Sequence, residues 1–100
     1  MYVLMTYDVE ARRTEKFKKL LRKYLGHAQY SVFSGDLSEA KLIELRRSIS
    51  RLLKPGERVM EVTAANRNNV KVVHFVKSES GKGEAKRFAD HSHSSDYAIL

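Results

Sequence analysis

The chain has 100 residues, 42% of them hydrophobic, so we expect one domain with a modest core. Its 19 lysines and arginines outnumber its 12 acidic residues, and the net charge of +7 favours nucleic acid as a partner, ahead of anionic membranes. No apolar run is long enough to cross a membrane, no secretory signal pattern is visible, and cysteine is absent, so we expect a cytoplasmic protein without disulfides.

Residues 2–8, Tyr-Val-Leu-Met-Thr-Tyr-Asp, are rich in β-branched and aromatic types, which predicts a strand. Only Thr6 interrupts the apolar run, so we expect both faces to be covered and the strand to lie centrally in its sheet. Asp8 then stands at the carboxyl end of a central strand, where open α/β sheets bind their ligands. A turn-forming or helix-capping role is the alternative for Asp8.

The segment from Val9 to Leu25 has the hydrophobic period of an amphipathic helix, and Gly26 is placed to end it. The polar face of this helix is strongly basic and includes a single acid, Glu15. A solvated surface is the simplest interpretation of such a face, and nucleic-acid binding is the functional one. Its cations are Arg12, Arg13, Lys16, Lys18, Lys19, Arg22 and Lys23.

Residues 28–37 indicate extended chain with a bend or bulge near Ser31, either one bent strand or two short ones. A second amphipathic helix follows, with Ser38 as its N-cap, Leu37 and Leu42 as a hydrophobic staple, and Pro55-Gly56 at its end.

Two further strands are predicted at residues 57–63 and 70–76, separated by an asparagine-rich turn. Beyond Lys77 the chain is too polar to pack, so residues 1–77 are predicted as the domain and 78–100 as a polar tail. The apolar end of the tail, residues 97–100, is a candidate for docking on a partner.

The predicted element order is strand, helix, bent strand or strand pair, helix, strand, strand. This order favours an α+β fold. The expected form is a two-layer ferredoxin-like sandwich with an antiparallel-rich sheet, two helices on one face and an extra C-terminal strand.

The motifs that carry chemistry are few. His91 and His93, with nearby aspartates, are weak evidence for a metal site, and no glycine-rich phosphate loop is present. Asp8 alone is a poor Mg²⁺ site, because Mg²⁺ needs several oxygen ligands. A two-fold dimer would add a second Asp8, and the two could then hold one Mg²⁺ against a phosphodiester. Stacking on bases or packing in the core are the alternatives for the aromatic residues Tyr7, Tyr30 and Phe33.

The opening Met-Tyr-Val-Leu-Met-Thr-Tyr-Asp-Val resembles that of the small CRISPR-associated protein that partners the spacer integrase, the second core adaptation protein. Residues 29–37, Gln-Tyr-Ser-Val-Phe-Ser-Gly-Asp-Leu, resemble the same family at its usual distance from the aspartate. The resemblance covers residues 1–76. His27 stands where many relatives have a basic residue, and Ser34 where a glutamate is frequent.

The resemblance implies a ferredoxin-like homodimer whose two strand-end aspartates face each other. It further implies Mg²⁺-dependent endonuclease activity on single-stranded RNA or double-stranded DNA, and a place between two integrase dimers. By position Asp8 matches the metal ligand, Tyr7 its catalytic neighbour and Phe33 the family's aromatic. The basic helix face and the resemblance together give the expected nucleic-acid-binding residues, which are Arg12, Arg13, Lys16, His27 and Phe33.

Three functions remain open from the sequence. The leading hypothesis is a dimeric nucleic-acid-binding adaptor of spacer acquisition with an Asp8-dependent nuclease activity. The alternatives are a free-standing toxin-type ribonuclease of similar fold and a non-enzymatic ligand-binding regulatory module.

Overall fold

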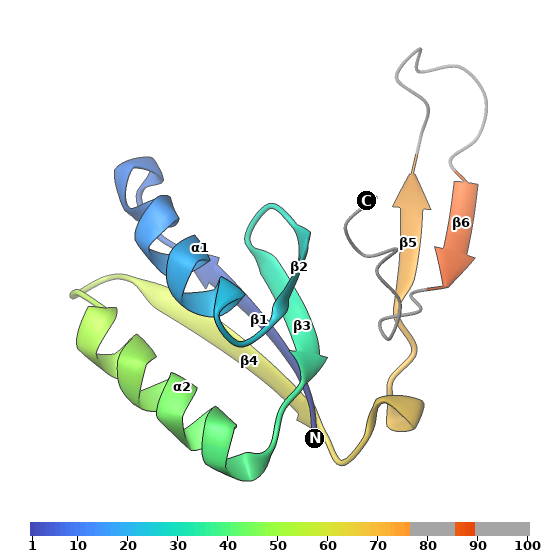
Figure 1. The fold of residues 1–100 in the computed structure, drawn as a ribbon. Helices are drawn as coiled ribbons and strands as arrows, with labels where there is room; N and C mark the ends of the chain where they lie inside the picture. Colours follow the sequence, from blue (N-terminus) through green and yellow to red (C-terminus); the bar gives the residue numbers. More distant parts are fainter. Residues whose placement is uncertain (77–85, 90–100) are drawn as a thin grey trace.

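The computed structural model of the chain describes residues 1–76 and 86–89 (Figure 1). Its elements are, in chain order, β1 (Tyr2–Asp8), the 3-10 turn η1 (Ala11–Arg13), α1 (Thr14–Arg22), β2 (Gly26–Gln29), β3 (Val32–Asp36), α2 (Glu39–Leu52), β4 (Arg58–Ala64), the 3-10 turn η2 (Arg67–Asn69), β5 (Val73–Val76) and β6 (Lys86–Ala89).

The main sheet has the strand order β2-β3-β1-β4, and every neighbouring pair is antiparallel. The helices α1 and α2 lie side by side on one face of this sheet (Figure 1). This βαββαβ arrangement is ferredoxin-like, as predicted, and β1 is a central strand between β3 and β4. Neither described helix is long and apolar enough to cross a membrane.

The core forms between the helices and one face of the sheet. Because successive side chains of a strand point to opposite faces, Val3, Met5 and Tyr7 of β1 all face the helices. They pack against Phe17 and Leu21 of α1 and against apolar residues of α2. The α2 residues in this cluster are Leu42, Leu45 and Ile49.

The first helix is shorter than the sequence predicted. It ends at Arg22, and the chain then turns so that Leu25 still packs in the core. The prediction that Gly26 ends the helix is wrong, because Gly26 begins β2 and its φ is not positive.

The second helix begins as predicted. The Ser38 side chain accepts a hydrogen bond of 3.2 Å from the Lys41 backbone N–H, which makes Ser38 the N-cap. Leu42 belongs to the core cluster and the partly buried Leu37 packs against that cluster, which is consistent with a hydrophobic staple. After α2, Gly56 adopts a φ of +87° in the turn that leads into β4.

The extended segment at residues 28–37 is part of a hairpin of two strands, so the second of the two alternatives is correct. Gln29 pairs with Val32, which leaves Tyr30 and Ser31 as the turn. A register shift between His27 and Gln29 adds a local bulge in β2.

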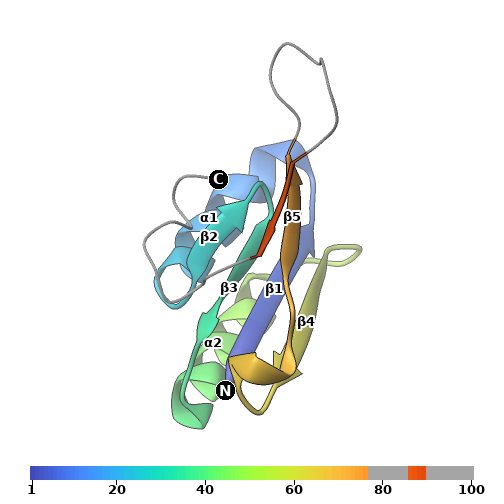
Figure 2. The same cartoon turned by 90° about the vertical axis from the view of Figure 1, so that its right-hand side faces the viewer.

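The last two strands form a sheet of their own, separate from the main sheet (Figure 1). In the turned view of Figure 2 they lie on the side of the main sheet opposite the helices. The 3-10 turn at residues 67–69 lies in the asparagine-rich turn that the sequence predicted, and strand β5 begins at Val73, three residues later than predicted. Strand β6 pairs antiparallel with it, from Val73 opposite Ala89 to Val76 opposite Lys86. The sequence did not predict β6, which falls in the predicted polar tail. The histidines at 91 and 93 and the apolar end at 97–100 lie outside the described residues.

Candidate metal and nucleic-acid site

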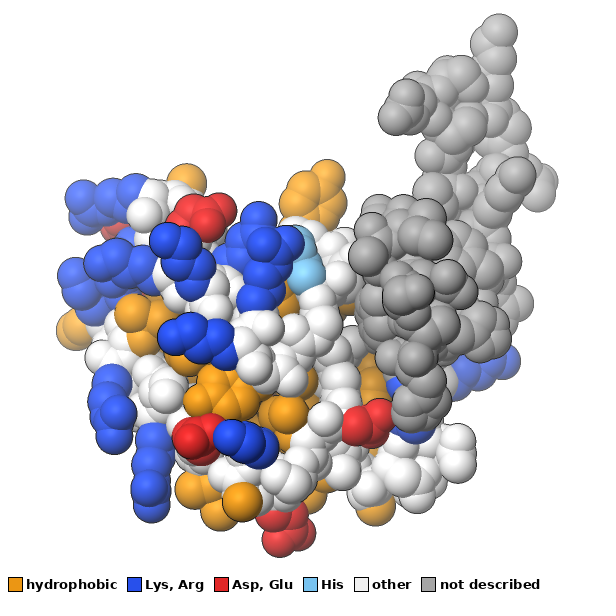
Figure 3. Space-filling view, viewed as in Figure 1, with side chains coloured by type: hydrophobic (Ala, Val, Ile, Leu, Met, Phe, Trp, Pro, Cys, Tyr) orange, Lys and Arg blue, Asp and Glu red, His pale blue; other side chains and the backbone are white. Residues whose placement is uncertain are grey.

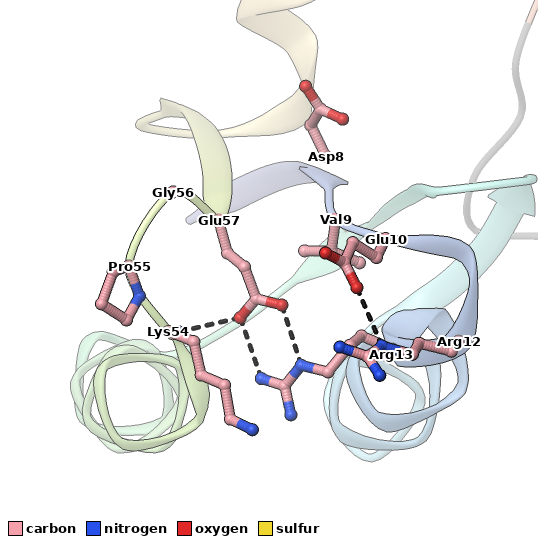
Figure 4. Close-up of a pocket in the computed structure, with 9 residues that line it drawn as sticks. All are labelled: Asp8, Val9, Glu10, Arg12, Arg13, Lys54, Pro55, Gly56 and Glu57. Carbon is pink, nitrogen blue, oxygen red and sulfur yellow. Dashed lines mark hydrogen bonds and ion pairs between the residues drawn. The ribbon is translucent and has the colours of Figure 1, made fainter.

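Asp8 is the last residue of β1 and lies opposite Arg58, the first residue of β4. Its side chain is exposed, and it lines a hollow of about 340 Å³ together with Glu10, Arg12 and the turn around Gly56. In Figure 4 the Asp8 carboxylate points away from the polar contacts that cross this hollow. The carboxylate is therefore available to a ligand.

The sheet face that carries Asp8 is the one that the helices leave open. Strand alternation places Leu4 and Thr6 on this face with Asp8, and cross-strand pairing places Val62 beside Leu4 and Met60 beside Thr6. The side chains of Met60 and Val62 are 58% and 43% exposed. We call Leu4, Met60 and Val62 the apolar strip.

A single chain supplies an incomplete donor set for a divalent cation. Among the residues that the structure describes, no three histidine, cysteine or acidic side chains gather closely enough to hold a metal ion. Asp8 offers one carboxylate, whereas Mg²⁺ takes about six oxygen ligands, several of them water or phosphate. The Asp8 site fits Mg²⁺ only if a second protein carboxylate joins it.

Tyr7 lies on the other side of the sheet from Asp8. Its ring is buried between Phe17 and Phe33, with ring centroids 5.6 Å and 6.0 Å away. Burial, followed by the nearby charge of Glu15, raises the pKa of the Tyr7 hydroxyl, so this group stays protonated at neutral pH. The structure therefore gives Tyr7 a packing role and does not bring its hydroxyl to the Asp8 carboxylate.

Arg13 is not on the surface, where the sequence placed it. Only 7% of the residue is exposed. Its Nε and Nη2 donate to the two carboxylate oxygens of Glu57 at 2.8 Å each (Figure 4). Nη2 also donates to the Leu52 carbonyl at 2.8 Å. The Glu57 carboxylate also accepts from the Lys54 backbone N–H at 2.8 Å. Arg13 thus joins η1 to the end of α2 and to the turn before β4.

This network favours the ionised form of the Glu57 carboxyl. Hydrogen bonds from Arg13, aided by the Lys54 backbone N–H, lower the pKa of the Glu57 carboxyl to about 2. Sequence reasoning missed Glu57, because it follows an ordinary Pro-Gly turn and its partner Arg13 is 44 residues away.

Arg12 and Lys16 remain exposed, as predicted for residues that bind a phosphate backbone. The Arg12 guanidinium is 83% exposed and forms a surface ion pair of 2.8 Å with Glu10. An ion pair so open to water is weak and can exchange for a phosphate. Lysine and arginine side chains spread over α1 and α2 in Figure 3. The exposed cations on these helices or directly after them include Lys19, Arg22, Lys23, Arg46, Arg47 and Arg51.

Phe33 and His27 stack on each other, with ring centroids 4.5 Å apart and an angle of 14° between the planes. Phe33 is fully buried and belongs to the core cluster, so in this chain its ring is not accessible to a base. His27 is partly exposed. Its Nδ1 lies 3.4 Å from Nη2 of Arg22, and its Nε2 contacts the Tyr30 carbonyl.

Comparison with known proteins adds independent information. Residues 1–72 match the family model for CRISPR associated protein Cas2. The chain is 40% identical over 60 residues to a CRISPR-associated endoribonuclease Cas2 of Haloferax volcanii, covering 60% of this chain and 70% of the relative. It is 46% identical over 57 residues to the protein of the same name in Thermotoga maritima, covering 57% of this chain and 66% of the relative.

A solved crystal structure of Cas2 superposes on the chain with a TM-score of 0.60 at 42% sequence identity. The superposition covers 62% of this chain and 71% of that protein. The sequence matches span only about two thirds of the relatives, so the activity in their names is not transferred to this chain by similarity alone.

Proposed function

This chain belongs to the family of CRISPR associated protein Cas2, and we propose that it acts in the cytoplasm as a homodimeric nucleic-acid-binding adaptor of CRISPR spacer acquisition. We further propose that paired Asp8 side chains give it Mg²⁺-dependent endonuclease activity. Family membership favours this function over the toxin-type ribonuclease and the regulatory module that the sequence left open.

The observation that supports the proposal best is the position of Asp8 beside the apolar strip. Contiguous apolar surface on a sheet face favours burial against a partner. A second copy stacked on this face about a two-fold axis would cover the strip of both chains. The same axis would bring the partner's Asp8 to the same end of the sheets, which would supply the second carboxylate.

In this arrangement each residue has a distinct task. The two Asp8 carboxylates would hold the cation, while Arg12 and Lys16 would bind phosphates of the substrate backbone. The bound Mg²⁺ would supply an activated water and offset the charge that develops in an in-line displacement. Arg13 and Glu57 keep the two chain segments next to Asp8 in place and do not contact the substrate.

The names of the relatives support RNA as a substrate, and the basic helices are equally suited to a DNA duplex. The adaptor function requires a complex with integrase dimers, and the exposed cations of α1 and α2 would support the DNA between them. Binding and cleavage are separable in this proposal, because the lysines and arginines that bind the nucleic acid are distinct from Asp8, which serves cleavage.

The test compares Asp8→Asn with Glu10→Gln, which removes an exposed carboxylate from the same hollow. Both variants and the unaltered chain are incubated with single-stranded RNA and with duplex DNA in Mg²⁺. We expect Asp8→Asn to abolish cleavage, with binding unchanged, and Glu10→Gln to cleave normally. Cleavage that persists in Asp8→Asn would refute the metal role. Failure to co-purify with the integrase would refute the adaptor role.

A further inference from the structure

Tyr30 occupies the first position of the two-residue turn between β2 and β3, and 90% of the residue is exposed. Its φ is +39°, the only positive φ at a non-glycine residue in the described part of the chain. Turns of this length favour glycine, asparagine or aspartate where φ is positive, because the Cβ of other residues is strained there. Core packing does not explain an exposed aromatic ring on strained backbone, and such strain is concentrated at functional sites.

The Tyr30 backbone contacts a stack of two rings, of which one is in the core. The His27 imidazole contacts the Tyr30 carbonyl through Nε2, and the same ring stacks on the fully buried Phe33. The turn is thereby anchored to the core while the Tyr30 side chain extends into solvent. The backbone of Tyr30 is therefore restrained, while the faces of its ring are exposed to solvent.

A hollow of about 370 Å³ lies next to the turn. Its lining includes Tyr30 and His27 from the hairpin and Lys18 from α1. Lys18 forms a long i,i+3 ion pair of 3.8 Å with Glu15, which also lines the hollow and is 69% exposed. A pair so long and open to water is weak and can exchange for a phosphate. The hollow therefore combines an aromatic face with a cation that can exchange its ion pair for another anion. It shares no lining residue with the hollow at Asp8.

We propose that Tyr30 and this hollow form a subsite for one unpaired nucleobase, which stacks on the Tyr30 ring while Lys18 binds the adjoining phosphate. An unpaired base has both faces available for stacking on an aromatic side chain, whereas a base inside a duplex does not. The inference rests on the proposed nucleic-acid binding and adds a preference for single-stranded segments or frayed ends.

The first experiment uses the absence of tryptophan from the chain. Tyr30→Trp introduces a single tryptophan, whose fluorescence is quenched when a base stacks on the indole. We expect quenching by a single-stranded oligonucleotide and none by an abasic oligonucleotide with the same phosphates. The matched control is Ile43→Trp, at a position 49% exposed on α2, which should respond equally to both ligands. Equal responses of the Tyr30→Trp variant to the two oligonucleotides would overturn the proposal.

The second experiment compares Tyr30→Gly with Tyr30→Phe in the full-length chain. Glycine suits a positive φ, so the Tyr30→Gly variant should unfold at a temperature no lower than the unaltered chain. It should bind the single-stranded oligonucleotide about tenfold more weakly, the loss expected for one stacked base, and bind a blunt duplex equally well. Tyr30→Phe keeps the ring and should bind both ligands normally.

The outcomes separate this subsite from the proposed function. Unchanged single-strand affinity in Tyr30→Gly, with duplex binding intact, would overturn the subsite and leave the proposed function standing. No binding of either nucleic acid by the unaltered chain would overturn both. Loss of the integrase complex in Tyr30→Gly, with both affinities unchanged, would assign Tyr30 to a protein interface and also overturn the subsite.

Discussion

Arg13 and Glu57 form a two-point ion pair, in which Nε and Nη2 of the guanidinium each donate to a different carboxylate oxygen at 2.8 Å. Their side chains are only 9% and 10% exposed. Glu57 directly precedes Arg58, the cross-strand partner of Asp8, and Arg13 belongs to the turn η1 that follows β1. The pair therefore fixes the backbone on both sides of the Asp8 carboxylate.

We predict that Glu57→Gln destabilises the fold, because it leaves the buried Arg13 charge without its counter-ion. The expected fall in Tm is about 5 °C or more. Glu61→Gln is the matched control, since it makes the same change in the more exposed Arg46–Glu61 pair. Thermal unfolding followed by circular dichroism checks this. A fall in Glu57→Gln no larger than that in Glu61→Gln would show that the buried pair contributes no more than a surface pair.

The same pair predicts a pH dependence. The folded-state pKa of Glu57 is about 2, below the usual 4.5, because the carboxylate is bound by Arg13 and the Lys54 backbone N–H. A lowered folded pKa adds stability that is fully present above the usual pKa and is lost as the pH falls from about 4.5 toward about 2. Glu57→Gln lacks this titration. The difference in urea midpoint between the unaltered chain and Glu57→Gln should therefore shrink as the pH is lowered from 5 to about 2.5. A constant difference would contradict the assignment.

The sequence was sufficient for the main sheet and the helices, because their signals are local. The apolar run ending at Asp8 indicates a central strand, and Ser38 before an apolar stripe indicates a helix start. The prediction for Arg13 was wrong, because the sequence placed this residue on the basic face of a helix starting near Val9. Residues 11–13 instead form a 3-10 turn, and this directs Arg13 inward toward a partner 44 residues away. No local pattern reports such a pair.

The aromatic residues show the same limit. Tyr7, Tyr30 and Phe33 were equivalent candidates for base stacking or core packing, and only the fold separates them. Strand alternation buries Tyr7 and Phe33, whereas the turn exposes Tyr30. Strand β6 was missed because its stability depends on pairing with β5 and not on an apolar pattern of its own.

We predict that the double substitution Arg12→Ala and Lys16→Ala lowers the salt dependence of duplex DNA binding. Each lost phosphate contact should reduce the slope of log K against log salt by about one unit. Arg13 is left intact, because removing it would disturb the fold. Lys71→Ala is the control, since it removes an exposed charge that lies outside α1 and α2 and should leave the slope unchanged. Equal slopes in the double variant and the unaltered chain would identify Arg12 and Lys16 as a merely solvated surface.

The apolar strip carries the last prediction, which concerns the dimer. Met60→Glu places a charge in the middle of the proposed interface, where burial without a partner is unfavourable. The variant should keep its secondary structure but remain a monomer at concentrations where the unaltered chain is a dimer, as measured by sedimentation. Ile43→Glu makes the same kind of change at a similarly exposed position on α2 and should remain dimeric.

Activity provides the decisive readout for this dimer, because one chain supplies one Asp8. Met60→Glu should lose Mg²⁺-dependent cleavage along with dimerisation. Pre-equilibrated equal amounts of the unaltered chain and Asp8→Asn should cleave at about a quarter of the rate of the unaltered chain at the same total concentration, because about a quarter of randomly formed dimers contain two Asp8 carboxylates. A rate of about one half would mean that each Asp8 acts alone, and the paired metal site would then be wrong.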